Sequence, residues 1–377
     1  MSREVGRIGV TLPSRTAPLG TVADYSELAE KAGFASIWTY ELYRDPLQML
    51  SNCATRTDQV QLGTGVAAAF SRSPFVLANA VADIDELSGG RMTVGLGTGV
   101  PEVLQAFHSA PTGQPLRRMR EYMQVLRCSW HYMITGDVEP FAGEFYRFQP
   151  PALNVFGLRP GGREQIPIYL AAMGPKMLQL VGERADGWIG YLASPKFLEQ
   201  VVMPNISLGA QRAGRDVSEI DIAAELICSV SPDREVAMRR ARIQVGTYLA
   251  HPVSDRVVAL HGLQEAQLKL RMGLMSEGPT ALERTDDRLV EAFSVCGTPE
   301  EARQRLDEYR TLPHKVLHTP YVPPLTAEES DDAYRNLIET FAPKSDAGQV
   351  ADMPQPEVGL RGGCAAESLA DAHGEES

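Results

Sequence analysis

Residues 62–99 read LGTGVAAAFSRSPFVLANAVADIDELSGGRMTVGLGTG, with one helix-like run between two strand-like runs. The helix-like run, residues 74–87, starts with proline and is followed by a pair of glycines, which is typical of helix starts and stops. The flanking runs, residues 60–66 and 92–96, are short and apolar, as expected of strands buried in a parallel sheet. This stretch therefore predicts a strand–helix–strand unit.

The same alternation continues in both directions along the chain. Strands are predicted at residues 7–12, 36–40, 60–66, 92–96, 166–171, 187–191, 220–230 and 315–321. Helices are predicted at residues 22–32, 46–56, 74–87, 116–134, 175–184, 195–213, 234–248, 299–309 and 327–341. Eight strands alternating with helices predict an α/β fold, a single (β/α)8 TIM barrel. A doubly wound open sheet is the rival, but the glycine-rich turn that it requires after the first strand is replaced by Pro13-Ser14-Arg15.

One domain is expected over residues 1–344, with insertions near residues 139–165 and 250–294. Residues 345–377 are rich in Gly, Ser, Ala and acidic residues and predict a disordered acidic tail.

Composition narrows the functional class. The net charge of −12 argues against nucleic acid or an anionic membrane surface as the main partner. The five cysteines are scattered without the C-x2-C spacing of a metal site, so we expect reduced thiols and no metal. The chain starts without a signal-peptide pattern and contains no apolar run of about 20 residues, so a soluble, cytoplasmic protein is expected.

In a TIM barrel the functional residues follow the carboxyl ends of the strands. Glu41 lies at the tip of the second strand and is a candidate acid or base, with an ion pair to Arg44 or Arg72 as the alternative. Tyr40 is a candidate proton donor, although packing is the commoner role of a tyrosine there. His318 lies in the eighth strand, where a structural role inside the barrel is the commoner one.

Small residues follow the third, fourth and fifth strands. Those after the third strand allow a flat ring to approach the backbone closely, or simply relieve crowding between strands. The Gly97-Thr98 pair is explained equally well by a tight turn. Gly174-Pro175-Lys176 opens a helix, and its free N–H groups with the lysine favour an anion, or mark an ordinary helix start.

The order of these motifs resembles that of luciferase-like monooxygenases and their deazaflavin (F420)-dependent relatives. Their pattern is Gly-x-Gly at the end of the third strand, Arg-x-Pro at a helix start, and LSGGR before a glycine-rich strand. Residues 62–99 carry all three parts, and residues 166–190, IPIYLAAMGPKMLQLVGERADGWIG, match a second block. The likeness covers residues 5–342 and is greatest to the branch similar to methylenetetrahydromethanopterin reductases.

The resemblance implies that F420, with FMN as the alternative, lies across the barrel mouth. It also implies a non-prolyl cis peptide bond at about Gly65–Val66 and a phosphate held by the turn before the fifth helix. The implied cofactor-binding residues are Gly65, Val66, Ala67, Arg72, Gly97, Thr98, Ala172, Met173, Gly174, Pro175 and Lys176.

Two departures bear on the chemistry. F420-dependent dehydrogenases carry Asp-His where this chain has Glu41-Leu42, and an acid where it has Val100-Pro101. The base that alcohol oxidation needs is therefore missing, and reduction of a C=C or C=N bond in an organic small molecule is favoured. Glu41 and Tyr40 are the predicted catalytic residues, with Leu42 expected to make the surroundings of Glu41 apolar and so keep its carboxyl protonated.

The alternatives are an FMN-dependent monooxygenase and a non-catalytic flavin-binding protein. A homodimer is also compatible with the sequence.

Overall fold

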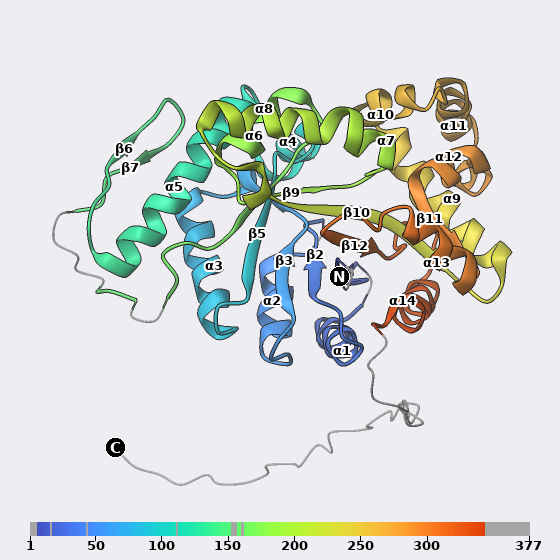
Figure 1. Ribbon diagram of the computed structural model, residues 1–377, viewed down its shortest axis with the longest axis horizontal. Coiled ribbons are helices and arrows are strands. Elements are labelled where there is room, and N and C mark those ends of the chain that lie inside the picture. The colour runs from blue at the N-terminus through green and yellow to red at the C-terminus, as the bar shows by residue number, and fades with distance from the viewer. Residues whose placement is uncertain are drawn as a thin grey trace, which may run out of the picture. The chain divides into compact units, whose positions relative to one another are not determined.

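The computed structural model describes residues 6–343, apart from residues 16, 43, 111, 152–156, 160 and 161. The predicted barrel is confirmed: eight strands run parallel, each paired with the next, and the last pairs with the first (Figure 1). In their order around the barrel these strands are β1 (Arg7–Thr11), β2 (Ser36–Thr39), β3 (Gln61–Thr64), β5 (Met92–Gly97), β8 (Ile168–Ala171), β9 (Gly187–Gly190), β10 (Asp221–Val230) and β12 (His314–His318).

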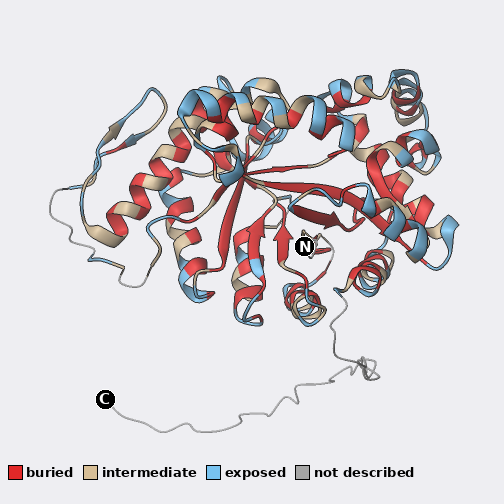
Figure 2. Ribbon diagram, in the orientation of Figure 1, coloured by how far each residue is buried: buried red, intermediate tan, exposed pale blue. Residues whose placement is uncertain are grey.

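The strands form where they do because both of their faces are covered. Every residue of β2, β5, β9 and β12 is buried, which explains the continuous apolar runs in the sequence (Figure 2). Residues that point inward fill the barrel axis, where Trp38, Tyr169, Ile189, Ala223 and Val316 form a cluster of their own.

Residues that point outward pack against the surrounding helices, whose far faces are exposed (Figure 2). The longer of these helices are α1 (Leu19–Lys31), α2 (Pro46–Ala54), α3 (Pro74–Leu87), α5 (Pro115–Thr135), α6 (Pro175–Arg184), α8 (Met203–Ala213), α9 (Arg234–Ala250), α13 (Pro299–Asp307) and α14 (Ala327–Phe341).

The two ranges in which insertions are expected contain the following elements. Residues 139–165 include a small antiparallel hairpin, β6 (Phe141–Ala142) with β7 (Arg147–Phe148), beside α5. Most of residues 250–294 are helical. They include α10 (Asp255–Leu260), α11 (Gln264–Glu277), a 3-10 segment (Gly278–Arg284) and α12 (Asp287–Phe293).

The structure also corrects the prediction in three places. A helix that was not predicted, α4 (Pro101–His108), follows β5, and only Leu104 of it is buried. A further strand, β11 (Ser294–Gly297), pairs with the second half of β10, which extends beyond its partner β9. The helix predicted at residues 195–213 is split into α7 (Pro195–Phe197), a π-helical turn (Leu198–Val202) and α8.

The predicted tail, residues 345–377, lies outside the described residues. Within the described part of the chain, no helix is both long enough and apolar enough to cross a membrane.

The LSGGR segment acts as a structural clamp. Gly89 and Gly90 both adopt positive φ angles (67° and 89°), which lets the chain turn sharply from α3 into β5. The turn buries Arg91, whose guanidinium donates to backbone and hydroxyl oxygens of the α2–β3 connection and of its own turn. These acceptors are Ser88 O (2.7 Å), Ala54 O (3.3 Å), Thr57 O (2.7 Å), Thr57 Oγ1 (2.9 Å) and Val60 O (2.9 Å).

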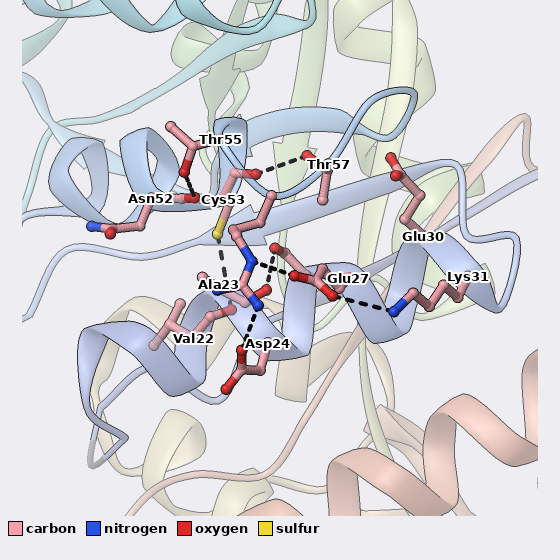
Figure 3. A network of polar contacts seen from close by, with 12 residues as sticks. Val22, Ala23, Asp24, Glu27, Glu30, Lys31, Asn52, Cys53, Thr55 and Thr57 are labelled. Carbon is pink, nitrogen blue, oxygen red and sulfur yellow. Dashed lines mark hydrogen bonds and ion pairs between the residues drawn. The ribbon is translucent and has the colours of Figure 1, made fainter. Parts of the chain in front are cut away.

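Glu30 completes the clamp from α1. Its carboxylate accepts the backbone N–H groups of Asp58, Gln59 and Val60. On the exposed side of the same helix pair, Arg56 binds Glu27 and, at 3.0 Å, Asp24; Figure 3 shows both carboxylates on α1 beside the end of α2. The connection that leads into β3 is therefore held by a buried arginine on one side and a carboxylate on the other.

Replacing Arg91 by lysine tests the clamp. A lysine cannot reach all of these oxygens, and buried carbonyl groups without donors destabilise the fold, so Arg91→Lys is expected to lower the free energy of unfolding by about 3 kcal/mol. Chemical denaturation measures the loss. Arg56→Lys is the matched control, since its ion pairs are exposed, and is expected to change stability little. Equal, small effects of the two substitutions would contradict the clamp.

Candidate active site

The barrel brings the predicted cofactor-binding segments together on one arc of its mouth. In the order β3–β5–β8 the three strands are neighbours, and small residues lie at their carboxyl ends. The short strand β4 (Ala67–Ala68) continues the arc by pairing with Leu96 and Gly97 of β5. The arc therefore offers a surface with little side-chain bulk, against which a flat ring system can lie.

The expected cis peptide bond is present, between Gly65 and Val66. The Gly65 N–H donates to Thr39 O (2.7 Å), and Val66 O accepts from the Glu41 N–H (3.2 Å), so the bulge is tied to the end of β2. A Cβ atom on Gly97 would lie 2.5 Å from Val66 Cγ2. The end of β5 therefore packs so closely against the bulge that a glycine is required there.

The start of α6 forms the other end of the arc. Gly174 precedes the helix, no side chain caps its first turn, and no atom lies within 4 Å of the position that a Cβ on Gly174 would take. Lys176 is exposed in that first turn, whereas Ala172 is buried and Met173 and Pro175 are half-buried. Open space, uncapped N–H groups and a cation suit an anionic group such as a phosphate.

Glu41 and Arg72 form an ion pair at the end of β2. Arg72 Nη2 donates to Glu41 Oε1 at 2.7 Å, and the other carboxylate oxygen accepts the Ala68 N–H at 2.8 Å. The ion pair with Arg72, the alternative weighed for Glu41, is therefore what the structure shows. Leu42 is 53% exposed, so the expectation that it makes the surroundings of Glu41 apolar is wrong.

Tyr40 lies deeper, in the interior of the mouth. Its ring stacks on Tyr321 with centroids 4.4 Å apart and lies 6.0 Å from the His318 ring. Its buried hydroxyl lies near Ser14 and Arg15 but has no well-formed hydrogen bond among the described residues. Tyr40 and Glu41 are consecutive, but Tyr40 turns into the barrel and Glu41 turns to the rim.

The structure adds an interior polar cluster that the sequence analysis missed. It consists of Glu225 from β10, His318 from β12, and the phenols of Tyr248 and Tyr321. Tyr248 Oη lies 3.3 Å from both His318 Nε2 and Tyr321 Oη. A usable signal was the lone glutamate at an inward position of the otherwise apolar run 222–228, two residues after inward-facing Ala223.

The ionisable groups of the cluster are uncharged near neutral pH because they are buried. Burial raises the pKa of Glu225 to about 8 and lowers the pKa of His318 to about 4. Burial likewise raises the pKa of Tyr321 to about 12 and the pKa of Tyr248 above its ordinary value. Among the described residues, no group of three or more His, Cys, Asp or Glu side chains is arranged to hold a metal ion.

Comparisons with known proteins agree with this architecture. Residues 5–314 match the family model described as luciferase-like monooxygenase. The 5,10-methylenetetrahydromethanopterin reductase of Methanolobus tindarius is 32% identical over 299 residues, which is 77% of this chain and 87% of the relative.

Solved structures share the fold. The coenzyme F420 dependent tetrahydromethanopterin reductase from Methanopyrus kandleri superposes with a TM-score of 0.73 at 25% identity, covering 89% of this chain and 99% of that one. An oxygenating constituent of 3,6-diketocamphane monooxygenase from Pseudomonas putida, solved with FMN, superposes with a TM-score of 0.63 at 16% identity, covering 90% and 97%, and shows the fold alone. With a family match that spans most of its length and a relative more than 30% identical, the chain belongs to the luciferase-like monooxygenase family and is an oxidoreductase.

Proposed function

We propose that this oxidoreductase is an F420-dependent reductase that acts on a C=C or C=N bond of an organic small molecule. The observation that supports this proposal most strongly is the arc of β3, β5 and β8, which joins a surface of small residues to an uncapped helix start beside Lys176. The arc fits a cofactor with a flat ring at one end and a phosphate at the other. Relatives named as 5,10-methylenetetrahydromethanopterin reductases, at 32% identity, support a reductive reaction. The coenzyme F420 dependent reductase from Methanopyrus kandleri supports a deazaflavin.

The residues that would hold the cofactor divide into two sets. Gly65, Val66, Ala67, Gly97 and Thr98 would face the ring, because their backbone is close to the mouth and their side chains are small. The segment 172–176 would hold the phosphate through the first N–H groups of α6 and the Lys176 ammonium. When bound, reduced F420 supplies a hydride.

Glu41 and Tyr40 have separate places in this proposal. Glu41 would be a positioning residue, since its carboxylate binds both the Ala68 N–H of the bulge and the Arg72 guanidinium and so fixes where they lie. Arg72 would then face the cofactor at a fixed place on the rim. Tyr40 offers a buried hydroxyl with no well-formed hydrogen bond among the described residues, although its pKa is raised by burial, which makes it a poor source of protons.

Cofactor choice decides between reductase and monooxygenase. The purified protein is expected to bind F420 at least about tenfold more tightly than FMN, a difference of roughly 1.4 kcal/mol. Titration of each cofactor followed by its fluorescence measures both dissociation constants. Tighter binding of FMN, together with NADH-driven oxygen consumption, would instead make the protein a flavin monooxygenase.

A second test addresses the phosphate end of the arc. Lys176→Gln is expected to weaken F420 binding about tenfold, because it removes one charge-assisted contact to an anion. Lys31→Gln is the matched control: Lys31 is an exposed lysine in the last turn of α1, whose contact is an ion pair with Glu27, and the change should leave affinity unaltered. Equal affinities of the Lys176 variant and the wild type would remove Lys176 from the cofactor site.

A further inference from the structure

The Glu225 carboxyl lies beside the bulge of the proposed cofactor site. Its side chain is 7% exposed. On the side toward the amino ends of the strands, Ala223 and its register partner Ile189 are fully buried. On the other side, Glu225 Oε1, itself a buried atom, lies 2.8 Å from the position that a Cβ on Gly65 would take. The carboxyl is therefore a direct neighbour of the bulge.

Two polar atoms of this cluster face each other without partners. Glu225 Oε1 and His318 Nδ1 are 4.0 Å apart, which is too long for a hydrogen bond, and neither atom has another partner among the described residues. Buried polar atoms without partners are uncommon and destabilising, and use by a ligand or a reaction is one reason for a protein to hold them. The buried hydroxyl of Tyr40 likewise has no well-formed hydrogen bond among the described residues.

The groups that face Glu225 carry no positive charge that would favour its ionised form. His318 faces it from β12, Tyr191 from the end of β9, Tyr248 from α9 and Tyr321 from the segment after β12. Burial keeps these phenols in their neutral form, and no lysine or arginine forms an ion pair with Glu225 within the described chain. A carboxyl in this setting keeps its proton near neutral pH and can give it away.

We propose that Glu225, and not Glu41, is the proton donor of the reaction, an inference that rests on the proposed reductase function. Both oxygens of Glu41 already accept hydrogen bonds from Ala68 and Arg72, whereas Glu225 Oε1 is a buried oxygen without a donor among the described residues. The acceptor carbon of the substrate takes a hydride from reduced F420, which is thereby oxidised by two electrons. The π electrons of the C=C or C=N bond move to the neighbouring atom, which takes the proton as the O–H bond of Glu225 breaks. The carboxylate that is left regains a proton from water at the mouth once the product has gone.

The protonated state can be tested without a substrate. An unfolded chain ionises this carboxyl at its ordinary pKa of 4.5, whereas the folded protein holds the proton up to a pKa of about 8. Between these values the folded state binds more protons, so the stability of the wild type falls as pH rises. Glu225→Gln removes this dependence. The melting temperature of the variant minus that of the wild type is therefore expected to increase from about pH 6.5 to about pH 8.

Glu121→Gln is the matched control for stability. Burial of Glu121 raises its pKa, but three backbone N–H donors outweigh this effect and lower the pKa overall. Glu121 is therefore ionised across this pH range. The melting temperature of Glu121→Gln minus that of the wild type should stay constant with pH. Infrared spectroscopy supplies a second reading, a protonated-carboxyl band that is present in the wild type and absent from Glu225→Gln. A flat difference for Glu225→Gln without that band would overturn the proposal.

The donor role is tested with the protein loaded with reduced F420, and with cyclohexenone and pyrroline as probe acceptors. Glu225→Gln is expected to bind F420 within a few-fold of the wild type but to lower turnover about 10²-fold. The turnover of the wild type should fall as pH rises through about 8. The Glu41→Gln variant should keep this fall in turnover, and the Glu225→Gln variant should not show it.

Unchanged turnover in Glu225→Gln would overturn the role of Glu225. So would a pH dependence of turnover that disappears in Glu41→Gln but not in Glu225→Gln. If the wild type binds F420 but reduces neither acceptor, or does not bind F420, the reductase function fails and the donor role fails with it. The melting and infrared results still report separately whether the carboxyl is protonated.

Discussion

The packed barrel axis is the constraint on which the rest of this structure depends. Trp38, Ile189, Ala223 and Val316 meet inside the strands and leave no room for a ligand at that depth. Because all eight strands run parallel, their carboxyl ends open at the same side of this plug. Glu225, two residues nearer the carboxyl end of β10 than Ala223, is buried beside Gly65 of the bulge, at the end of the barrel where the mouth opens.

The two halves of the mouth have different characters. The β3–β5–β8 arc is built from small residues and an uncapped helix start, so mainly backbone atoms line this side of the mouth. The opposite side, from β10, β12 and α9, presents side chains that can carry or share protons, namely Glu225, His318 and Tyr248. A division of this kind suits hydride transfer, in which a cofactor is held on one side and the proton comes from the other.

Most of the barrel could be predicted from the sequence, because short apolar runs and helix stops are local signals. The helix α3 (Pro74–Leu87) was predicted to the residue, since proline starts it and two glycines follow it. The strand β11 was missed because it depends on the unusual length of β10, a tertiary feature. The small residues of the arc are visible in the sequence, but the cis bond between Gly65 and Val66 was expected only from the resemblance to luciferase-like enzymes, and the structure confirms it. The cluster around Glu225 was not predictable, because Tyr40, Glu225 and His318 meet only when β2, β10 and β12 close the barrel.

The central claim is that one mouth holds a deazaflavin on the small-residue arc and faces it with Glu225. A crystal structure of the protein with F420 tests this claim most directly. The ring is expected to lie against residues 65–67, the phosphate at the start of α6, and the Glu225 carboxyl toward the space beside the ring. A cofactor bound elsewhere on the chain, or a Glu225 carboxyl sealed off from the mouth, would contradict it.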